Sequence, residues 1–338
     1  MDVPEQRGQR AVEAERILAQ IEELQPEGQR RVVNQHVVSR VLLKRFAAND
    51  RVISFDLHHP ANRHRPGSTK TCGTVPDFVP FASASLEEVW SRVENLLPTA
   101  ADAVERGDIF EHEEHILTLK DFIALHRARS LHYLAMHYRA AAAAYERAWD
   151  ALAAIPTDRL RATYRQHTGL YVAAKGAREA IGARLMQPFT DNLRSGADLR
   201  VSIERMFGEL RTAIRETCLE IVTPKSGEFL IGDIPALPVR REGTVLSCVT
   251  ALEDSAAIVL PFGRKHLLVG RAPSNDMAAI PADMVDCLNT LQVEAAYSRV
   301  YLHPGSGLEH FVRAHLAAGG RADRTPLEPP RRDAGTTP

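Results

Sequence analysis

The chain has 338 residues, of which 44% are hydrophobic and 25% are charged, which is typical of a soluble globular protein with a sizeable core. Its 42 Lys and Arg residues nearly balance 43 Asp and Glu residues, so no net positive field attracts polyanions. Nucleic-acid binding would therefore depend on a local basic patch. The four cysteines are widely and irregularly spaced, which disfavours a zinc finger and fits a reducing cytoplasm.

The two ends of the chain are predicted to lie outside its folded part. Residues 1–29 form a polar leader in which residues 11–24 predict a short amphipathic helix. The leader lacks the apolar core of a signal peptide, and no segment approaches the roughly 20 apolar residues of a membrane span. Residues 317–338 are rich in Pro, Gly and charge and predict a disordered tail. We therefore expect a cytoplasmic protein with no membrane partner.

Residues 30–316 are predicted to form a single globular domain. "RVISFDL", residues 51–57, is rich in β-branched and aromatic residues and predicts a strand. At Ser85 the pattern becomes helical, because Ser85 and Glu88 form an S-x-x-E capping box ahead of apolar residues at helical spacing. Pro98 is expected to kink or end that helix.

Helical patterns then dominate, and the predicted helical core extends over about residues 85–216. The following segment, about residues 217–302, is predicted to form a sheet and a helix. "CLEIVT" and "EFLIG" predict a hairpin around "PKSG", "AAIVLPF" and "KHLLVGR" predict a second strand pair, and "PADMVDCLNTLQVEAAYSRVY" predicts a helix that begins near Pro281. The predicted fold class is α+β: mainly a helical bundle, with a short N-terminal strand region and a small C-terminal antiparallel sheet.

Several short segments occur in an order that identifies a family. They are "NQHVVSRVLLKRF" (residues 34–46), the helix containing Glu94, "DFIALHRARS" with Arg129, "FLIGDIP" with Asp233, and the pair Leu288 and Asn289. In this order, over roughly residues 32–305, the chain resembles the domain-of-unknown-function 4238 family of bacterial proteins, which is marked by an N-terminal "HYVP" motif. The Tyr and Pro of that motif are replaced here by Val37 and Ser39. Any chemical role of the tyrosine hydroxyl would therefore be lost.

His36 is the first candidate for a functional side chain. A histidine titrates near neutral pH and can act as a general base or a metal ligand. The alternative is a structural hydrogen bond where the N-terminal segment enters the fold.

Arg127 and Arg129 are candidates for binding an anion. Arg127 lies among apolar positions of the central helix, where a guanidinium needs an anion or a route to solvent. Arg129 lies on another face and is the position that matches the family. Two arginines near a helix end can hold an anion or orient Asp233, and a structural ion pair is the alternative.

Asp233 directly follows an apolar strand and precedes Ile234 and Pro235. A carboxylate at a strand end can bind a metal or activate water. Asp also stabilises turns, because its side chain accepts hydrogen bonds from neighbouring backbone N–H groups.

Other patterns carry less weight. "HEEH", residues 112–115, lacks the H-E-x-x-H spacing of a metalloprotease, and the histidine-rich loop around His58, His59 and His64 suggests adventitious metal binding. No P-loop, G-x-S-x-G or G-x-G-x-x-G motif is present, so the sequence has no nucleotide-cofactor motif. A basic run could face phosphates or simply solvent; it comprises Arg30, Arg31, Arg40, Lys44 and Arg45.

Two hypotheses for function remain open. One is a hydrolase, assisted by a divalent metal, that acts on phosphodiesters in a nuclease-like reaction, with a site built from His36, Asp233 and one or both of Arg127 and Arg129. The other is a non-catalytic module that binds a protein, or a nucleic acid through the basic patch. In the second case the same polar residues hold the fold together.

Overall fold

The structure, a computed structural model, describes residues 34–76, 78–79, 83–242, 245–249 and 253–319. The predicted helix at residues 11–24, and the predicted tail beyond residue 319, lie outside these ranges. The chain divides into two compact units, which are described separately. The first contains Val79–Glu87 and Met136–Ser202, and the second contains Asn34–Phe78, Glu88–Ala135 and the chain from Ile203 onward.

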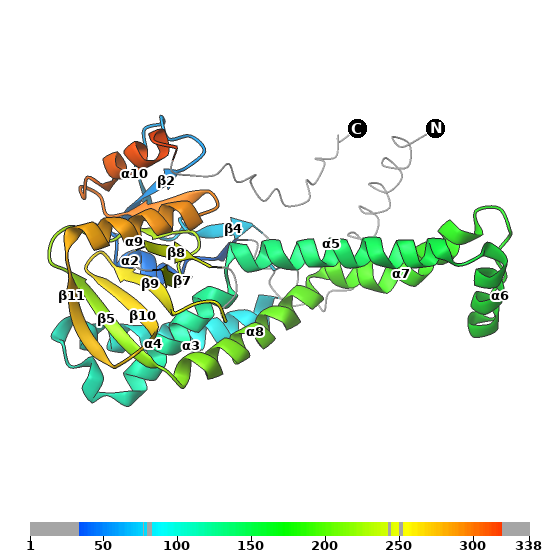
Figure 1. The fold of residues 1–338 in the computed structure, drawn as a ribbon, viewed down its shortest axis with the longest axis horizontal. Coiled ribbons are helices and arrows are strands. Elements are labelled where there is room, and N and C mark those ends of the chain that lie inside the picture. Colours follow the sequence, from blue (N-terminus) through cyan, green and yellow to red (C-terminus); the bar gives the residue numbers. More distant parts are fainter. Residues whose placement is uncertain (1–33, 77, 80–82, 243–244, 250–252, 320–338) are drawn as a thin grey trace. The chain divides into compact units, whose positions relative to one another are not determined.

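The first unit is helical. Its helices are α5 (Leu131–Ala154, which enters this unit at Met136), α6 (Thr157–Thr168) and α7 (Ala177–Ser195) (Figure 1). Leu160, Tyr164 and Ile181 form a small buried core between α6 and α7. The Trp149 ring of α5 lies directly over Gly182 of α7, where a Cβ atom would overlap the ring. Close packing of α5 on α7 therefore requires glycine at this position.

A six-stranded mixed sheet forms most of the second unit. Its strand order is β11-β5-β10-β9-β7-β8, where only β11 and β5 run parallel among these neighbours. The strands are β5 (Cys218–Pro224), β7 (Leu237–Glu242), β8 (Val245–Cys248), β9 (Ala257–Gly263), β10 (His266–Ala272) and β11 (Asp276–Ile280).

Helix α4 (Glu113–Ala128) packs on this sheet (Figure 1). Ile123 contacts Gly270 of β10, and Phe122 meets Phe262 of β9 edge to face at 6.2 Å. Nearly every residue of α4 from Leu119 to Ala128 is buried, so its polar groups lie inside the unit. The other helices whose bounds matter here are α3 (Ser83–Arg106), the 3-10 turn η1 (Ile109–Glu111) and α8 (Ala197–Arg215).

A second, four-stranded sheet joins distant parts of the sequence. Its order is β3-β2-β12-β6, all antiparallel. The strands are β2 (Arg51–Asp56), β3 (Pro66–Ser68), β6 (Ile231–Gly232) and β12 (Arg299–Leu302), and the helices that pack with them are α9 (Ala282–Ala295) and α10 (Leu308–Ala317). Buried apolar side chains such as Phe55, Leu230 and Val300 form the core beneath α9 and α10.

The family-marking segment forms a strand and a short helix. Strand β1 (Asn34–His36) pairs antiparallel with β4 (Thr74–Pro76), and helix α2 (Arg40–Lys44) follows. Leu42, Leu43 and Phe46 are fully buried. This segment is therefore anchored in the core by its apolar second half.

The fold is α+β, as predicted, but the predicted arrangement is wrong. A helical bundle with a short N-terminal strand region and a small C-terminal antiparallel sheet does not describe the second unit, which contains a six-stranded mixed sheet and a four-stranded sheet. The four-stranded sheet pairs residues near 53 with residues near 301, and such long-range pairing leaves no local sequence pattern.

Three local predictions also need correction. "CLEIVT" and the following apolar segment do not form a hairpin, because β5 and β6 belong to different sheets. The last predicted helix ends at Ala295, and the residues after it form β12. Helix α3 continues past Pro98, whose exposed position lets water solvate the carbonyl group that the proline leaves without a donor. The predicted strand pair β9 and β10 and the predicted strand β2 are confirmed.

Candidate functional site

His36 lies at the end of β1, where the backbone is tightly held. The N–H groups of Val37 and Val38 both donate to the Gly73 carbonyl, at 2.8 and 3.2 Å. The Gly73 N–H in turn donates to the Tyr301 hydroxyl at 3.1 Å. Gly73 has φ +73°, and a Cβ atom there would lie 2.9 Å from the Val38 carbonyl oxygen, so glycine is needed. These contacts hold the backbone that follows His36.

Arg129 lies at the C-terminal end of α4 with its guanidinium almost completely buried. The side chain is 2% exposed, and its Nη2 donates to Glu94 Oε1 of α3 at 2.8 Å. The guanidinium carbon lies 4.7 Å from the Trp90 ring centre, a cation–π contact. Within the part of the chain that the structure describes, Arg129 Nε has no hydrogen-bond partner. An unused donor in this setting costs about 1–3 kcal/mol unless something binds to it.

His126 lies one turn earlier on α4 and is 0% exposed. Its ring meets Phe122 edge to face at 4.5 Å. Neither ring nitrogen has a hydrogen-bond partner of normal geometry among the described residues. Burial holds the pKa of His126 well below its usual value, and the charge of Arg129 lowers it further. An interaction with the Val37 backbone raises the pKa, but by less. His126 is therefore a neutral imidazole beside a cation.

His36 belongs to the same group of side chains. Burial lowers the pKa of His36, and the positive charge of Arg129 lowers it further. The negative charge of Glu94 and a hydrogen bond with the Thr69 backbone raise it. Its Nε2 is buried and has no hydrogen-bond partner in the described ranges. We call His36, Glu94, His126 and Arg129 the His36 cluster. His36 is half-buried and the Glu94 side chain is 21% exposed, so these two residues are the more exposed members of the cluster.

Ser39 adds another buried polar atom near the start of the motif. It precedes α2 as the N-cap residue, yet its hydroxyl makes no capping hydrogen bond. The Oγ atom is buried and lacks a partner within the residues that the structure covers. This is the position at which the family motif has Pro, so the hydroxyl is a departure of this chain.

The His36 cluster combines complementary chemical properties. His36 and His126 are neutral imidazoles at pH 7 because their pKa values are lowered. A neutral imidazole can accept a proton, and Arg129 supplies a permanent positive charge. The arrangement suits an anionic ligand, which would accept hydrogen bonds from the buried donors.

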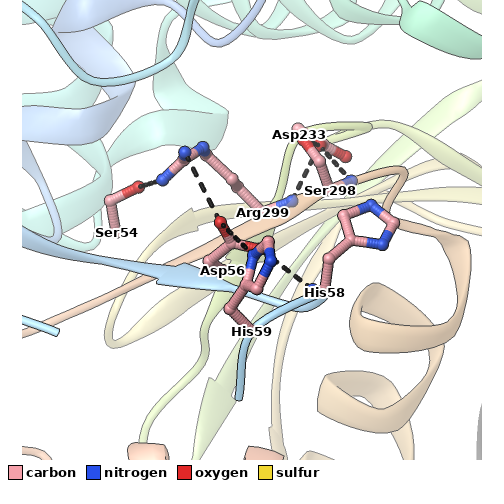
Figure 2. Close-up of polar contacts among 7 residues, drawn as sticks. All are labelled: Ser54, Asp56, His58, His59, Asp233, Ser298 and Arg299. Atoms are coloured by element: carbon pink, nitrogen blue, oxygen red, sulfur yellow. Dashed lines mark hydrogen bonds and ion pairs between the residues drawn. The ribbon is translucent and has the colours of Figure 1, made fainter. Parts of the chain in front are cut away.

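Asp233 is held by a different set of partners. One carboxylate oxygen accepts a hydrogen bond from the N–H group of Tyr297 at 2.7 Å. The other accepts from the N–H groups of Ser298 (2.8 Å) and Arg299 (2.9 Å) and from Ser298 Oγ (2.9 Å) (Figure 2). Burial raises the pKa of Asp233, and these hydrogen bonds oppose the rise. The carboxylate thus fastens the turn after β6 to the segment that enters β12.

Arg299 connects this turn to the histidine-rich loop. Its side chain donates to Ser54 Oγ at 3.2 Å and lies 3.7 Å from Asp56, which accepts the His58 N–H at 2.9 Å (Figure 2). His59 Nδ1 lies 3.4 Å from the same Asp56 carboxylate. The His59 and Arg299 side chains are exposed and Asp56 is partly exposed, and contacts at such a surface contribute little to stability.

Arg127 is directed to another part of the second unit. Burial lowers its pKa to about 10, and Cys248 of β8 opposes the change. The structure therefore brings together two of the four predicted site residues, His36 and Arg129, and Arg129 pairs with Glu94. Arg127 and Asp233 have different surroundings.

His126 was missed by sequence reasoning, although a signal for it exists. It precedes Arg129 by three residues, a spacing that puts two side chains near each other at a helix end. The segment around it is so apolar that a histidine there suggests a core residue.

Two members of the predicted basic run have acidic partners in the described residues. Arg45 is 17% exposed in its side chain and forms a 2.8 Å ion pair with Glu105. Arg40 lies 3.7 Å from Asp50. Arg30 and Arg31 lie outside the described ranges.

One group of side chains among the described residues could hold a metal ion. The ligand atoms of His112, Glu114 and His115 all lie within 4.8 Å of one another. The "HEEH" segment lacks the spacing of a metalloprotease motif. The turn that begins α4 nevertheless brings its three possible ligands together.

Comparison with known proteins places this α+β protein in a family. A family model described as a protein of unknown function (DUF4238) matches residues 34–306, so the chain belongs to this family, as the order of its motifs predicts. No curated protein and no solved structure matches the chain significantly. No described helix is both long and apolar enough to cross a lipid bilayer.

Proposed function

We propose that the protein hydrolyses phosphodiesters at the His36 cluster. The observation that carries the proposal is that His36 Nε2 and Arg129 Nε are buried with no hydrogen-bond partner among the described residues. Leaving such groups unsatisfied is unfavourable, and native proteins rarely do so without a functional reason. A phosphate oxygen would accept hydrogen bonds from these donors and would balance the Arg129 charge that Glu94 only partly faces.

The chemistry follows from the protonation states. His36, whose pKa is lowered, is neutral at pH 7 and can take a proton from the attacking water. Arg129 and His126 stabilise the negative charge that develops on the phosphoryl oxygens. The proton held by His36 then passes to the leaving alcohol oxygen as the P–O bond breaks. One diester and one water thus give one monoester and one alcohol.

Glu94 has a positioning role in this scheme. Its 2.8 Å ion pair with Arg129 fixes the guanidinium through Nη2 and leaves Nε for the substrate. The Trp90 ring supports the guanidinium from one side. Asp233 acts further away, by holding the backbone that leads into β12, whose Tyr301 hydroxyl accepts the Gly73 N–H.

A panel of phosphodiesters tests the proposal and its metal dependence. Single-stranded DNA, double-stranded DNA, RNA and bis(4-nitrophenyl) phosphate would be incubated with the full-length chain, with Mg²⁺ or Mn²⁺ and with EDTA. Hydrolysis that EDTA abolishes supports the metal-assisted form, and hydrolysis that survives EDTA assigns charge stabilisation to Arg129. Failure to hydrolyse any of these diesters contradicts the proposal.

A second candidate function is a non-catalytic interaction module for a protein or a nucleic acid. The observation that favours it is Asp233, whose hydrogen bonds all come from Tyr297, Ser298 and Arg299, as in a purely structural network. This function predicts no turnover of any diester. If the partner is a nucleic acid, binding would weaken steeply as the salt concentration rises.

A further inference from the structure

We propose that His112, Glu114 and His115 bind a divalent transition-metal ion of the zinc class. The proposal is independent of the proposed hydrolytic site. The three ligand atoms lie within 4.8 Å of one another, and His112 Nδ1 is 3.9 Å from Glu114 Oε1. Bonds of about 2.0–2.2 Å to a tetrahedral ion put ligand atoms roughly 3.4 Å apart. The Glu114 side chain is 71% exposed, so a small rotation closes the difference.

The backbone fixes the two imidazoles before any metal binds. His112 is the N-cap residue of α4, with φ −127° and ψ 95°, and its carbonyl accepts the N–H groups of His115 (3.1 Å) and Ile116 (3.2 Å). This turn places the two histidine rings 5.2 Å apart at 54°. Both histidines are half-buried, which restricts their motion. The site therefore needs little rearrangement to bind an ion.

The types of ligand define the class of ion. Two imidazole nitrogens and one carboxylate oxygen suit Zn²⁺, Co²⁺ or Ni²⁺, whereas Mg²⁺ and Ca²⁺ prefer sites made of oxygen ligands. Three protein ligands leave at least one coordination position open to water or to another oxygen donor. Glu114 faces solvent, so that position is accessible.

Acidic residues near the site offset the positive end of the α4 helix dipole, so the local charge favours a cation. The N-terminus of a helix carries a partial positive charge, which opposes metal binding. Glu113 and Glu114 lie in the first turn of α4 and offset that charge. Asp108, four residues before His112, carries a further negative charge, which Arg106 neutralises in a hydrogen-bonded ion pair.

Metal titration of the full-length chain tests the site. After dialysis against a chelator and then against chelator-free buffer, the chain would be titrated with Zn²⁺ by calorimetry and with Co²⁺ by visible absorption. We expect saturable binding of one equivalent, and an affinity at least about tenfold weaker in His115→Ala and in Glu114→Gln. Circular dichroism would show that each variant is folded. Glu114 is exposed, so Glu114→Gln is the safer variant for folding.

Two controls make the assignment specific. His167→Ala removes an exposed histidine of α6, and the double substitution His58→Ala with His59→Ala removes the other histidine-rich segment. Both should bind Zn²⁺ as the wild type does. Unchanged binding by His115→Ala and Glu114→Gln, loss of binding only in the His58 and His59 variant, or no saturable binding by the wild type would each overturn the proposal.

Discussion

A neutral histidine buried beside a fixed cation makes the His36 cluster sensitive to acid. His126 is 0% exposed, and burial together with Arg129 holds its pKa well below its usual value. The unfolded chain binds a proton on this histidine below about pH 6.5, whereas the folded chain does not. The contribution of His126 to stability is therefore fully present above that pH and is lost as the pH falls, by about 1.4 kcal/mol per pH unit.

We expect His126→Leu to remove this acid dependence. Leucine keeps an apolar contact with Phe122 and has no nitrogen to protonate, so the free energy of unfolding should fall less steeply between pH 6.5 and 5 than in the wild type. Urea unfolding at several pH values measures the slope. His167→Leu, at an exposed position, should keep the wild-type slope, and an identical slope in His126→Leu would show that His126 does not titrate as described.

Asp233 illustrates a residue whose surroundings decide its role. From the sequence, this carboxylate either binds a metal or activates water, or it stabilises a turn. The hydrogen bonds that it accepts from three backbone N–H groups support the second role. The sequence could not show this, because the donors lie more than 60 residues away, at Tyr297, Ser298 and Arg299.

Replacement of Asp233 with asparagine should destabilise the fold strongly. The asparagine amide keeps one acceptor oxygen, but its NH₂ group faces backbone N–H donors that the second carboxylate oxygen had accepted. Because a donor cannot pair with a donor, the free energy of unfolding should fall by about 2–4 kcal/mol. Asp56→Asn is the matched control, because Asp56 is a more exposed carboxylate that also contacts Arg299, and it should cost less than about 1 kcal/mol. Chemical denaturation compares the two, and equal losses would contradict the structural role of Asp233.

At the scale of elements, Gly73 connects the family-marking segment to the four-stranded sheet. Its carbonyl accepts the N–H groups of Val37 and Val38, and its own N–H donates to Tyr301 of β12. The positive φ of +73° and the close approach of Leu43 and Val38 both exclude a side chain. The position of His36 therefore depends on this glycine.

Gly73→Ala should lower both stability and any activity of the His36 cluster. The left-handed backbone conformation alone costs about 1–2 kcal/mol for alanine, and the overlap with Leu43 and Val38 adds to it. Gly305→Ala is the control, because Gly305 has φ +86° and open space around it, so it pays the backbone cost only. A thermal unfolding comparison in which both variants lose the same stability would contradict the clamping role of Gly73.

Local patterns predicted individual elements well and their connections poorly. Strand β2, helix α8 and the β9–β10 pair follow from hydrophobic periodicity and turn residues close in sequence. The partners of β2 do not, because β12 was predicted as the end of a helix and lies far along the chain. Pro98 was expected to kink or end α3, and the helix does not end there: buried Leu97 and Ala101 anchor it on both sides of the proline.

At the scale of the whole molecule, the candidate site is assembled from three separate segments of the second unit. His36 comes from β1, Glu94 from α3, and His126 and Arg129 from the end of α4. The family resemblance marked all three segments, and the sequence gave two of the four residues of the cluster, His36 and Arg129. The meeting of β1 with α4 depends on tertiary packing, so the cluster itself could not be predicted.

The hydrolysis of bis(4-nitrophenyl) phosphate by the full-length chain and by His36→Ala tests the central claim most directly. General-base catalysis by a histidine contributes about 10²–10⁴ in rate, so kcat/KM should fall at least about 100-fold in His36→Ala while His167→Ala stays at the wild-type value. The free energy of unfolding of each variant, measured on the same preparation, separates catalysis from folding. Equal kcat/KM for the wild type and a folded His36→Ala chain would contradict the account.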